Sequence, residues 1–111
     1  MKVRKNIGRM TFEFEASTHK EVFSQLSGLE EVFSETNCGR CHGEELRHLV
    51  REHDGYMFYE LRCLNSDCRA RLAYGQAREG DRLFPKRKDD AGNWIDSDGW
   101  QRWNPDTKRA E

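Results

Sequence analysis

Residues 38–42 read CGRCH and residues 63–68 read CLNSDC, and these two segments hold all four cysteines of the chain. The first segment fits the C-x-x-C-H signature of a c-type haem, in which two thiols attach the porphyrin and a histidine binds the iron. It also fits one half of a zinc site, where two closely spaced thiols hold one side of a tetrahedral ion. The rest of the chain decides between the two metals.

The spacing of the cysteines favours a single zinc site. Cys38 and Cys41 form a C-x2-C pair, and Cys63 and Cys68 form a C-x4-C pair after 21 intervening residues. A β-hairpin of that length folds back and brings the pairs together, in the geometry of a zinc ribbon, and a structural zinc takes four thiolates. Because four thiolates leave no open coordination position, we expect Zn²⁺ as a structural cofactor and not as a catalyst.

Two alternatives use the same segments. His42 and His48 lie close enough in sequence to replace one cysteine in a Cys3His site. The C-x-x-C pair alone could form a redox dithiol, but that function is typical of a βαβ context and does not use the second pair. We therefore prefer the four-cysteine site and expect both histidines to be exposed polar residues.

Length and composition indicate one small domain. The chain has 111 residues, of which 35% are charged and 35% hydrophobic, so a metal would add to a modest core. No run approaches the roughly 18 apolar residues of a membrane span, and no apolar segment follows the basic N-terminus as in an export signal. We therefore expect a location in the cytoplasm, where reduced thiols bind metal. This location disfavours haem, which is attached outside the cytoplasm.

Hydrophobic periodicity predicts an α+β fold. Residues 10–16 alternate apolar and acidic side chains, which predicts a strand, and residues 18–35 show the capping box and apolar stripe of a helix. The Asp-Gly pair at residues 54–55 lies between two apolar runs and predicts a β-hairpin, and residues 69–76 predict a third strand. We expect the N-terminal strand and helix to pack on a three-stranded antiparallel zinc ribbon.

The expected domain boundaries follow from this pattern. One domain is predicted over residues 1–103, and it begins with a strand and helix over residues 1–37. The ribbon follows over residues 38–76, and a polar, aromatic segment over residues 77–103 closes the domain. Residues 104–111 have the composition of a frayed tail.

The middle of the chain interleaves aromatic and basic side chains. Residues 38–88 carry eleven Lys and Arg against eight Asp and Glu, whereas the segments on either side are acidic. Aromatic rings stack on unpaired bases, while Lys and Arg neutralise phosphates. The predicted phosphate contacts are Arg62, Arg69, Arg71, Lys86, Arg87 and Lys88. The predicted stacking residues are Tyr59, Tyr74, Trp94 and Trp100.

Each of these residues also has a structural alternative. One set of the alternating hairpin aromatics is expected to form the core, and residues 86–88 stand beside two aspartates, as in a solvated turn. Of Trp94, Trp100 and Trp103, we expect two to cover the core or the ribbon and one to be exposed. The reason is that this segment has few aliphatic side chains to enclose all three rings.

The cysteine segment also resembles known proteins. Residues 38–74, with CLNSDC before a basic strand, are similar to the small zinc ribbons at the C-terminal end of bacterial type IA topoisomerases, which are associated with single-stranded DNA. Residues 11–103, with MFYELRC, RARLAYGQ, LFPKRK and GWQRW, resemble a family of short bacteriophage zinc-ribbon proteins from replication and recombination modules, although the C-x4-C spacing departs from the C-x2-C expected there. The resemblance implies a phage accessory protein that acts on single-stranded DNA in the host cytoplasm.

Two functions are therefore compatible with the sequence. The leading prediction is a single-stranded nucleic-acid-binding accessory protein of phage replication or recombination. The alternative is a protein-interaction module that binds or inhibits a host factor, which the net charge of −1 and the acidic tail favour. A homodimer is compatible with both, because zinc-ribbon sheets have exposed edges. No serine–histidine pair, carboxylate pair or phosphate loop is recognisable, so we predict no enzymatic activity.

Overall fold

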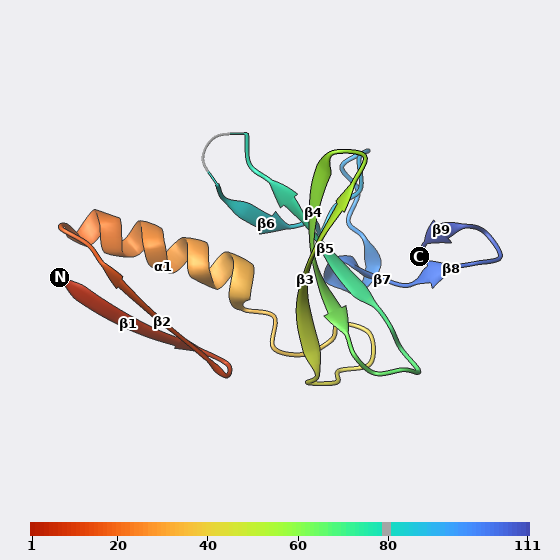
Figure 1. Ribbon diagram of the computed structural model, residues 1–111, viewed down its shortest axis with the longest axis horizontal. Coiled ribbons are helices and arrows are strands. Elements are labelled where there is room, and N and C mark those ends of the chain that lie inside the picture. Colours follow the sequence, from red (N-terminus) through yellow and green to blue (C-terminus); the bar gives the residue numbers. More distant parts are fainter. Residues whose placement is uncertain (79–80) are drawn as a thin grey trace. The chain divides into compact units, whose positions relative to one another are not determined.

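The computed structural model describes residues 1–78 and 81–111, so residues 79–80 of the predicted closing segment lie outside the described residues. Helix and antiparallel strands occur together in it, which confirms the α+β class (Figure 1). The chain divides into two compact units, Met1–Thr36 and Asn37–Glu111, where the sequence predicted one domain. The helix of the first unit has an apolar contact within that unit, because the ring centroids of Phe12 and Phe33 lie 4.9 Å apart.

The first unit is a β-hairpin followed by a helix. β1 (Lys2–Ile7) pairs antiparallel with β2 (Met10–Glu15), and α1 (His19–Phe33) follows. The Thr18 side chain accepts a hydrogen bond from the Glu21 amide at 3.2 Å, so the predicted start of the helix is confirmed.

The sequence analysis missed β1, because a lysine interrupts its apolar face. Val3, Lys5 and Ile7 share one half-buried face, and Lys5 forms an ion pair of 3.7 Å with Glu30 of the helix. In residues 1–36, all of which the structure describes, Ala16 is the one buried residue. A two-stranded hairpin is marginal alone, so contact with α1 stabilises this unit.

The second unit is built on an antiparallel sheet. The Asp54–Gly55 turn has positive φ angles of 52° and 84°, which confirms the predicted hairpin. Two further short strands join the far edge of the third, so the sheet extends beyond the three strands that were predicted. The strands described in this sheet are β3 (Leu46–His53), β4 (Tyr56–Cys63), β5 (Arg71–Gln76), β6 (Leu83–Pro85) and β7 (Trp100–Gln101).

The C-terminal residues, which the sequence predicted as a frayed tail, form a short antiparallel hairpin. A 3-10 turn, η1 (Asp96–Gly99), leads into β7, and β8 (Trp103–Asn104) then pairs with β9 (Arg109–Ala110). The backbone groups of Arg102 and Glu111 exchange two hydrogen bonds of 2.7 and 2.8 Å. Local composition does not reveal these backbone hydrogen bonds.

One tryptophan completes the core of the second unit. Trp100 is fully buried opposite Leu72, and a Cβ atom on Gly39 would lie 2.2 Å from its ring. Trp94 and Trp103 are 71% and 58% exposed, so the expectation of two covered tryptophans is wrong. The single indole fills the space between the sheet and the first cysteine loop. The buried core side chains are Leu61, Ala70, Leu72, Tyr74 and Trp100, together with Cys38, Cys63 and Cys68.

Candidate metal centre and arginine face

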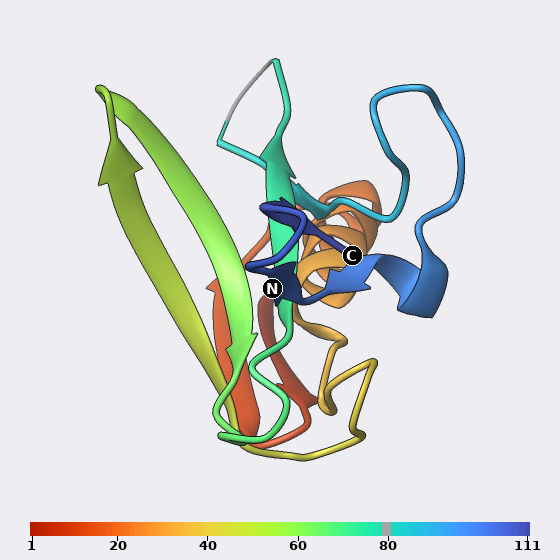
Figure 2. The same cartoon turned by 90° about the vertical axis from the view of Figure 1, so that its right-hand side faces the viewer.

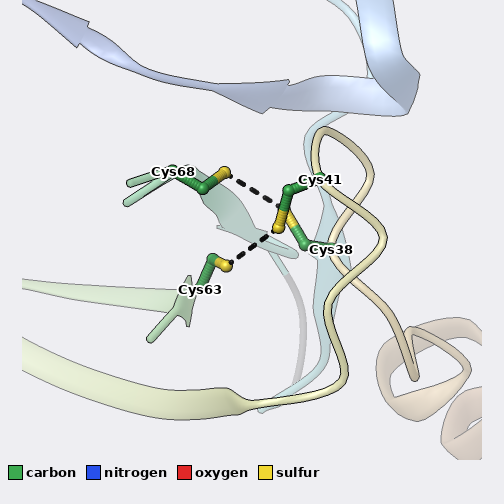
Figure 3. A group of neighbouring side chains, drawn as sticks. All are labelled: Cys38, Cys41, Cys63 and Cys68. Carbon is green, nitrogen blue, oxygen red and sulfur yellow. Dashed lines mark hydrogen bonds between the residues drawn. The ribbon is translucent and has the colours of Figure 1, made fainter. Parts of the chain in front are cut away.

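The four cysteines meet at one end of the sheet. Their sulfur atoms all lie within 4.8 Å of one another and point toward a common centre (Figure 3). Cys38 Sγ is 3.7 Å from Cys68 Sγ, and Cys41 Sγ is 3.5 Å from Cys63 Sγ. All four are free thiols, and three of them are buried. The predicted convergence of the two pairs is therefore confirmed.

The local backbone donates a hydrogen bond to each cysteine sulfur in the same pattern. Cys38 and Cys41 come from the loop before β3, Cys63 ends β4, and Cys68 lies in the loop before β5. Each sulfur accepts a hydrogen bond from the backbone amide two residues further on. The donors are Arg40, Gly43, Asn65 and Ala70. Amide donors stabilise negative sulfur, which suits thiolate ligands.

The electrostatics of the cluster differ from one sulfur to the next. Burial raises the pKa of the Cys38 thiol and raises that of Cys63 to about 12. Burial also acts on Cys68, but the Arg102 side chain and the Ala70 amide outweigh it and lower the pKa to about 6. Arg102 Nη2 donates to Cys68 Sγ at 3.3 Å. One sulfur is thus favoured as thiolate, and a bound cation would replace the protons on the others.

This donor set fits a tetrahedral metal ion. Zinc–sulfur bonds of about 2.3 Å place tetrahedral ligands about 3.8 Å apart, close to the separations of 3.5 and 3.7 Å. Within the described residues the ligand group contains no histidine, and both His42 and His48 are exposed. Four cysteines in one cluster, rather than one C-x-x-C pair, distinguish the site from a redox dithiol.

The strand register divides the side chains of the sheet between two faces. Residues that lie directly opposite each other in the antiparallel ladder share a face, and alternate residues along a strand do so as well. Arg62 lies opposite both Arg71 and Arg47, so the predicted pair of phosphate contacts in β4 and β5 shares one face. We call it the arginine face, and its charged residues are Arg47, Arg51, Glu60, Arg62 and Arg71.

Glu60 organises the arginine face. Its side chain is only 3% exposed, and it forms ion pairs with Arg62 at 2.7 Å and with Arg51 and Arg71 at 3.4 Å. Like charges opposite each other repel, so this carboxylate allows Arg62 and Arg71 to be cross-strand neighbours. Three guanidinium groups around one carboxylate leave the face positive.

A groove with basic walls lies where the arginine face meets the second cysteine loop. Its volume is about 410 Å³. Arg47 and Arg69 are exposed and form no ion pair with any residue that the structure describes. Arg69 was predicted as a phosphate contact, whereas Arg47 was missed because its place beside Arg62 depends on the strand register. We call this the arginine groove, and it is lined by Arg47, Leu49, Arg62, Cys63, Leu64, Ser66 and Arg69.

The predicted stacking residues lie elsewhere. Tyr59 pairs with Tyr74 on the face opposite to Arg62, and Tyr74 is only 7% exposed. Trp100 is fully buried. Tyr74 and Trp100 are therefore corrected to core residues, since neither ring offers a face to a base. Strand alternation places Tyr56 and Phe58, which the prediction missed, on the arginine face with Arg62. Counting back by two from Arg62 would have identified both.

Lys86, Arg87 and Lys88 form a separate basic segment. The Lys88 ammonium lies 4.6 Å from the centre of the exposed Trp94 ring, a cation–π contact between two predicted site residues. Arg87 donates to the Asp98 carbonyl at 2.6 Å, and Lys86 is exposed. None of the three is among the described residues that line the arginine groove. They remain candidate contacts at a different place.

The chain matches no protein-family model, and comparisons with curated proteins and with solved structures find no match either. Within the part of the chain that the structure describes, no helix is long and apolar enough to cross a membrane. Two features of the second unit therefore bear on its function, the cysteine cluster and the arginine face.

Proposed function

We propose that the second unit is a zinc ribbon whose arginine face binds single-stranded DNA, and that its zinc is structural. The cysteine cluster supports the zinc site, because four thiols with amide donors fit a closed tetrahedral ion. Such a site contributes folding energy on the order of 10 kcal/mol, which a small core needs. The protein would then bind its partner without catalysing a reaction.

The arginine groove is the observation that carries this proposal. Arg47 and Arg69 stand exposed on its walls without a carboxylate partner among the described residues, and Arg62 retains a 45% exposed side chain. Guanidinium groups pair with phosphates through two parallel hydrogen bonds. Leu49 and Leu64 offer apolar contact between the charges, which suits the sugars and bases of a nucleic acid.

The setting follows from the sequence resemblance. We place the protein among the accessory proteins of phage replication and recombination, in the bacterial cytoplasm, where a cluster of free thiols stays reduced. Its ligand would then be the single strands that replication exposes.

Fluorescence anisotropy of a labelled single-stranded oligonucleotide tests the proposal. Three groove arginines predict a slope of about −2 for log affinity against log salt, so affinity falls roughly twentyfold between about 50 and about 200 mM salt. Arg69→Gln should weaken binding and reduce the slope by about 0.7. Arg109→Gln, an exposed arginine of β9, is the matched control and should leave both unchanged. A response independent of salt would refute phosphate binding.

A second candidate function is a protein-interaction module that binds a host factor, and helix α1 favours it. No residue of α1 is buried, and Phe23 is 78% exposed. An aromatic ring this exposed offers an apolar contact that a partner protein would cover. This candidate predicts that wild-type protein captures one partner from bacterial lysate and that Phe23→Ser does not. Capture that is equal for both variants would count against it.

A further inference from the structure

The tip of the β3–β4 hairpin extends beyond the rest of its sheet. β3 and β4 pair along their whole lengths up to the turn, whereas β4 pairs with β5 only over Tyr59–Arg62. Figure 2 shows this tip standing apart from β5. We call residues 50–58 the hairpin arm. Along the arm, no described strand continues the ladder on the outer edge of β4, and β5 reaches this edge through a hydrogen bond of 2.8 Å from the Gln76 side chain to the Met57 carbonyl.

The arm exposes large side chains that a folded protein normally covers. Tyr56 is 71% exposed and Phe58 40%, and both lie on the arginine face. Val50 and Met57 are also exposed, on the opposite face. Clustered apolar groups at the surface indicate a binding surface.

The arm also carries a flat cationic element. The Arg51 guanidinium lies 4.7 Å from the centre of the Phe58 ring, opposite it in the strand register. Nucleobases stack on aromatic rings and on guanidinium planes alike. Tyr56 lies two positions before Phe58 on the same strand, so both rings project from the same face of the sheet.

We infer that the hairpin arm is a base-stacking subsite for single-stranded DNA, continuous with the arginine groove. This inference rests on the proposed function. Phe58 and Arg62 lie four positions apart, which is about 13 Å along the strand, so a few nucleotides reach from one subsite to the other. The phosphates lie on the arginines of the groove, and the bases lie on Tyr56 and on the Arg51–Phe58 pair.

Charge complementarity favours single-stranded DNA as the ligand of this face. The face that carries the arm aromatics also carries four arginines against one glutamate, so it attracts a polyanion. A base in a duplex is already stacked on its neighbours and paired on its edge. The arm is therefore the element that distinguishes a single strand from a double strand, while the groove binds the phosphates of both.

The test compares variants of the full chain on two probes, a mixed-sequence oligonucleotide of about twelve nucleotides and the same strand annealed to its complement. Tyr56→Ala and Phe58→Ala should each weaken single-strand binding about fivefold or more, the loss expected for one stacked base. Duplex binding and the salt slope should not change. Phe23→Ala removes an aromatic ring of α1 that is about as exposed as Tyr56 and is the matched control. Phe58→Tyr keeps an aromatic ring and should keep the affinity.

The outcomes separate the inference from the proposed function. Unchanged single-strand affinity in Tyr56→Ala and Phe58→Ala, with weaker binding in Arg69→Gln, would overturn the stacking subsite and leave the groove in place. It would then assign the arm to a protein partner or a second copy. If the wild-type chain binds neither probe at low salt, the proposed function fails and the subsite fails with it. Equal losses on single strand and duplex would also overturn the subsite, because stacking acts on unpaired bases.

Discussion

The charge of Glu60 should hold the arginine face together, and Glu60→Gln removes that charge while keeping the size of the side chain. The carboxylate is 3% exposed and receives Arg62 at 2.7 Å, with Arg51 and Arg71 at 3.4 Å. In the variant, three guanidinium groups remain around a neutral amide. Arg62 and Arg71, which lie directly opposite each other, then repel without compensation.

The expected cost is about 2 kcal/mol of unfolding free energy. Breaking a buried ion pair by removing one partner costs about 3–5 kcal/mol. The arginine side chains are 31–45% exposed, so water screens part of their repulsion and lowers that figure. With an m-value of about 1 kcal/mol/M for a unit of this size, the urea midpoint falls by about 2 M.

Urea unfolding at a fixed concentration of added zinc, followed by tryptophan fluorescence, measures this change. Trp100 is buried and reports on the second unit, while Trp94 and Trp103 are already exposed. Glu52→Gln on the neighbouring strand makes the same chemical change at an exposed position and should shift stability by less than about 0.5 kcal/mol.

Glu60→Gln should also bind single-stranded DNA more tightly at low salt, because Arg62 and Arg71 are released for phosphates. A Glu60→Gln protein as stable as wild type would refute the reasoning.

Three further predictions concern the metal centre and the core. Cys63→Ser should abolish stoichiometric zinc, measured by elemental analysis, whereas His42→Ala should retain it; equal zinc in both would exclude a four-cysteine site. Treatment with a strong chelator should unfold the second unit, seen as a loss of Trp100 burial in fluorescence, and an unchanged spectrum would show that the metal is not structural. Gly39→Ala should cost about 3 kcal/mol in thermal unfolding, because the new Cβ would meet the Trp100 ring, while Gly28→Ala, with open space around it, should stabilise α1 by up to about 1 kcal/mol.

The sequence predicts those features that depend on local spacing. The cysteine pairs, the Asp-Gly turn and the start of the helix are each encoded within a few residues, and all three are confirmed. The strand β1 was missed because Lys5 interrupts its apolar alternation, and its compensating partner Glu30 lies far away in sequence. Hydrophobic periodicity is read within one segment, so it does not detect an ion-pair partner on another segment.

The division of the candidate site between two faces depends on register, which sequence patterns fix only when one face is clearly apolar. In β4, tyrosine and phenylalanine occupy both faces, so the hydrophobic pattern does not reveal which aromatic rings are covered. Pairing with β5 decides it, since Tyr59 lies opposite Tyr74 and Arg62 lies opposite Arg71. The burial of Trp100 likewise depends on contact with Gly39, which is 61 residues away (100 minus 39).

The contact between Trp100 and Gly39 also has a consequence for the order in which the polypeptide is made. The first cysteine loop leaves the ribosome long before residue 100. During synthesis, its inner surface therefore stays uncovered until the Trp100 ring has been made. The hairpin and helix of residues 1–36 have no such dependence and can form as soon as they emerge. A nascent chain halted before residue 100 would carry all four cysteines and an incomplete core. Such an intermediate would be able to bind metal, but its incomplete core would leave it sensitive to cellular proteases.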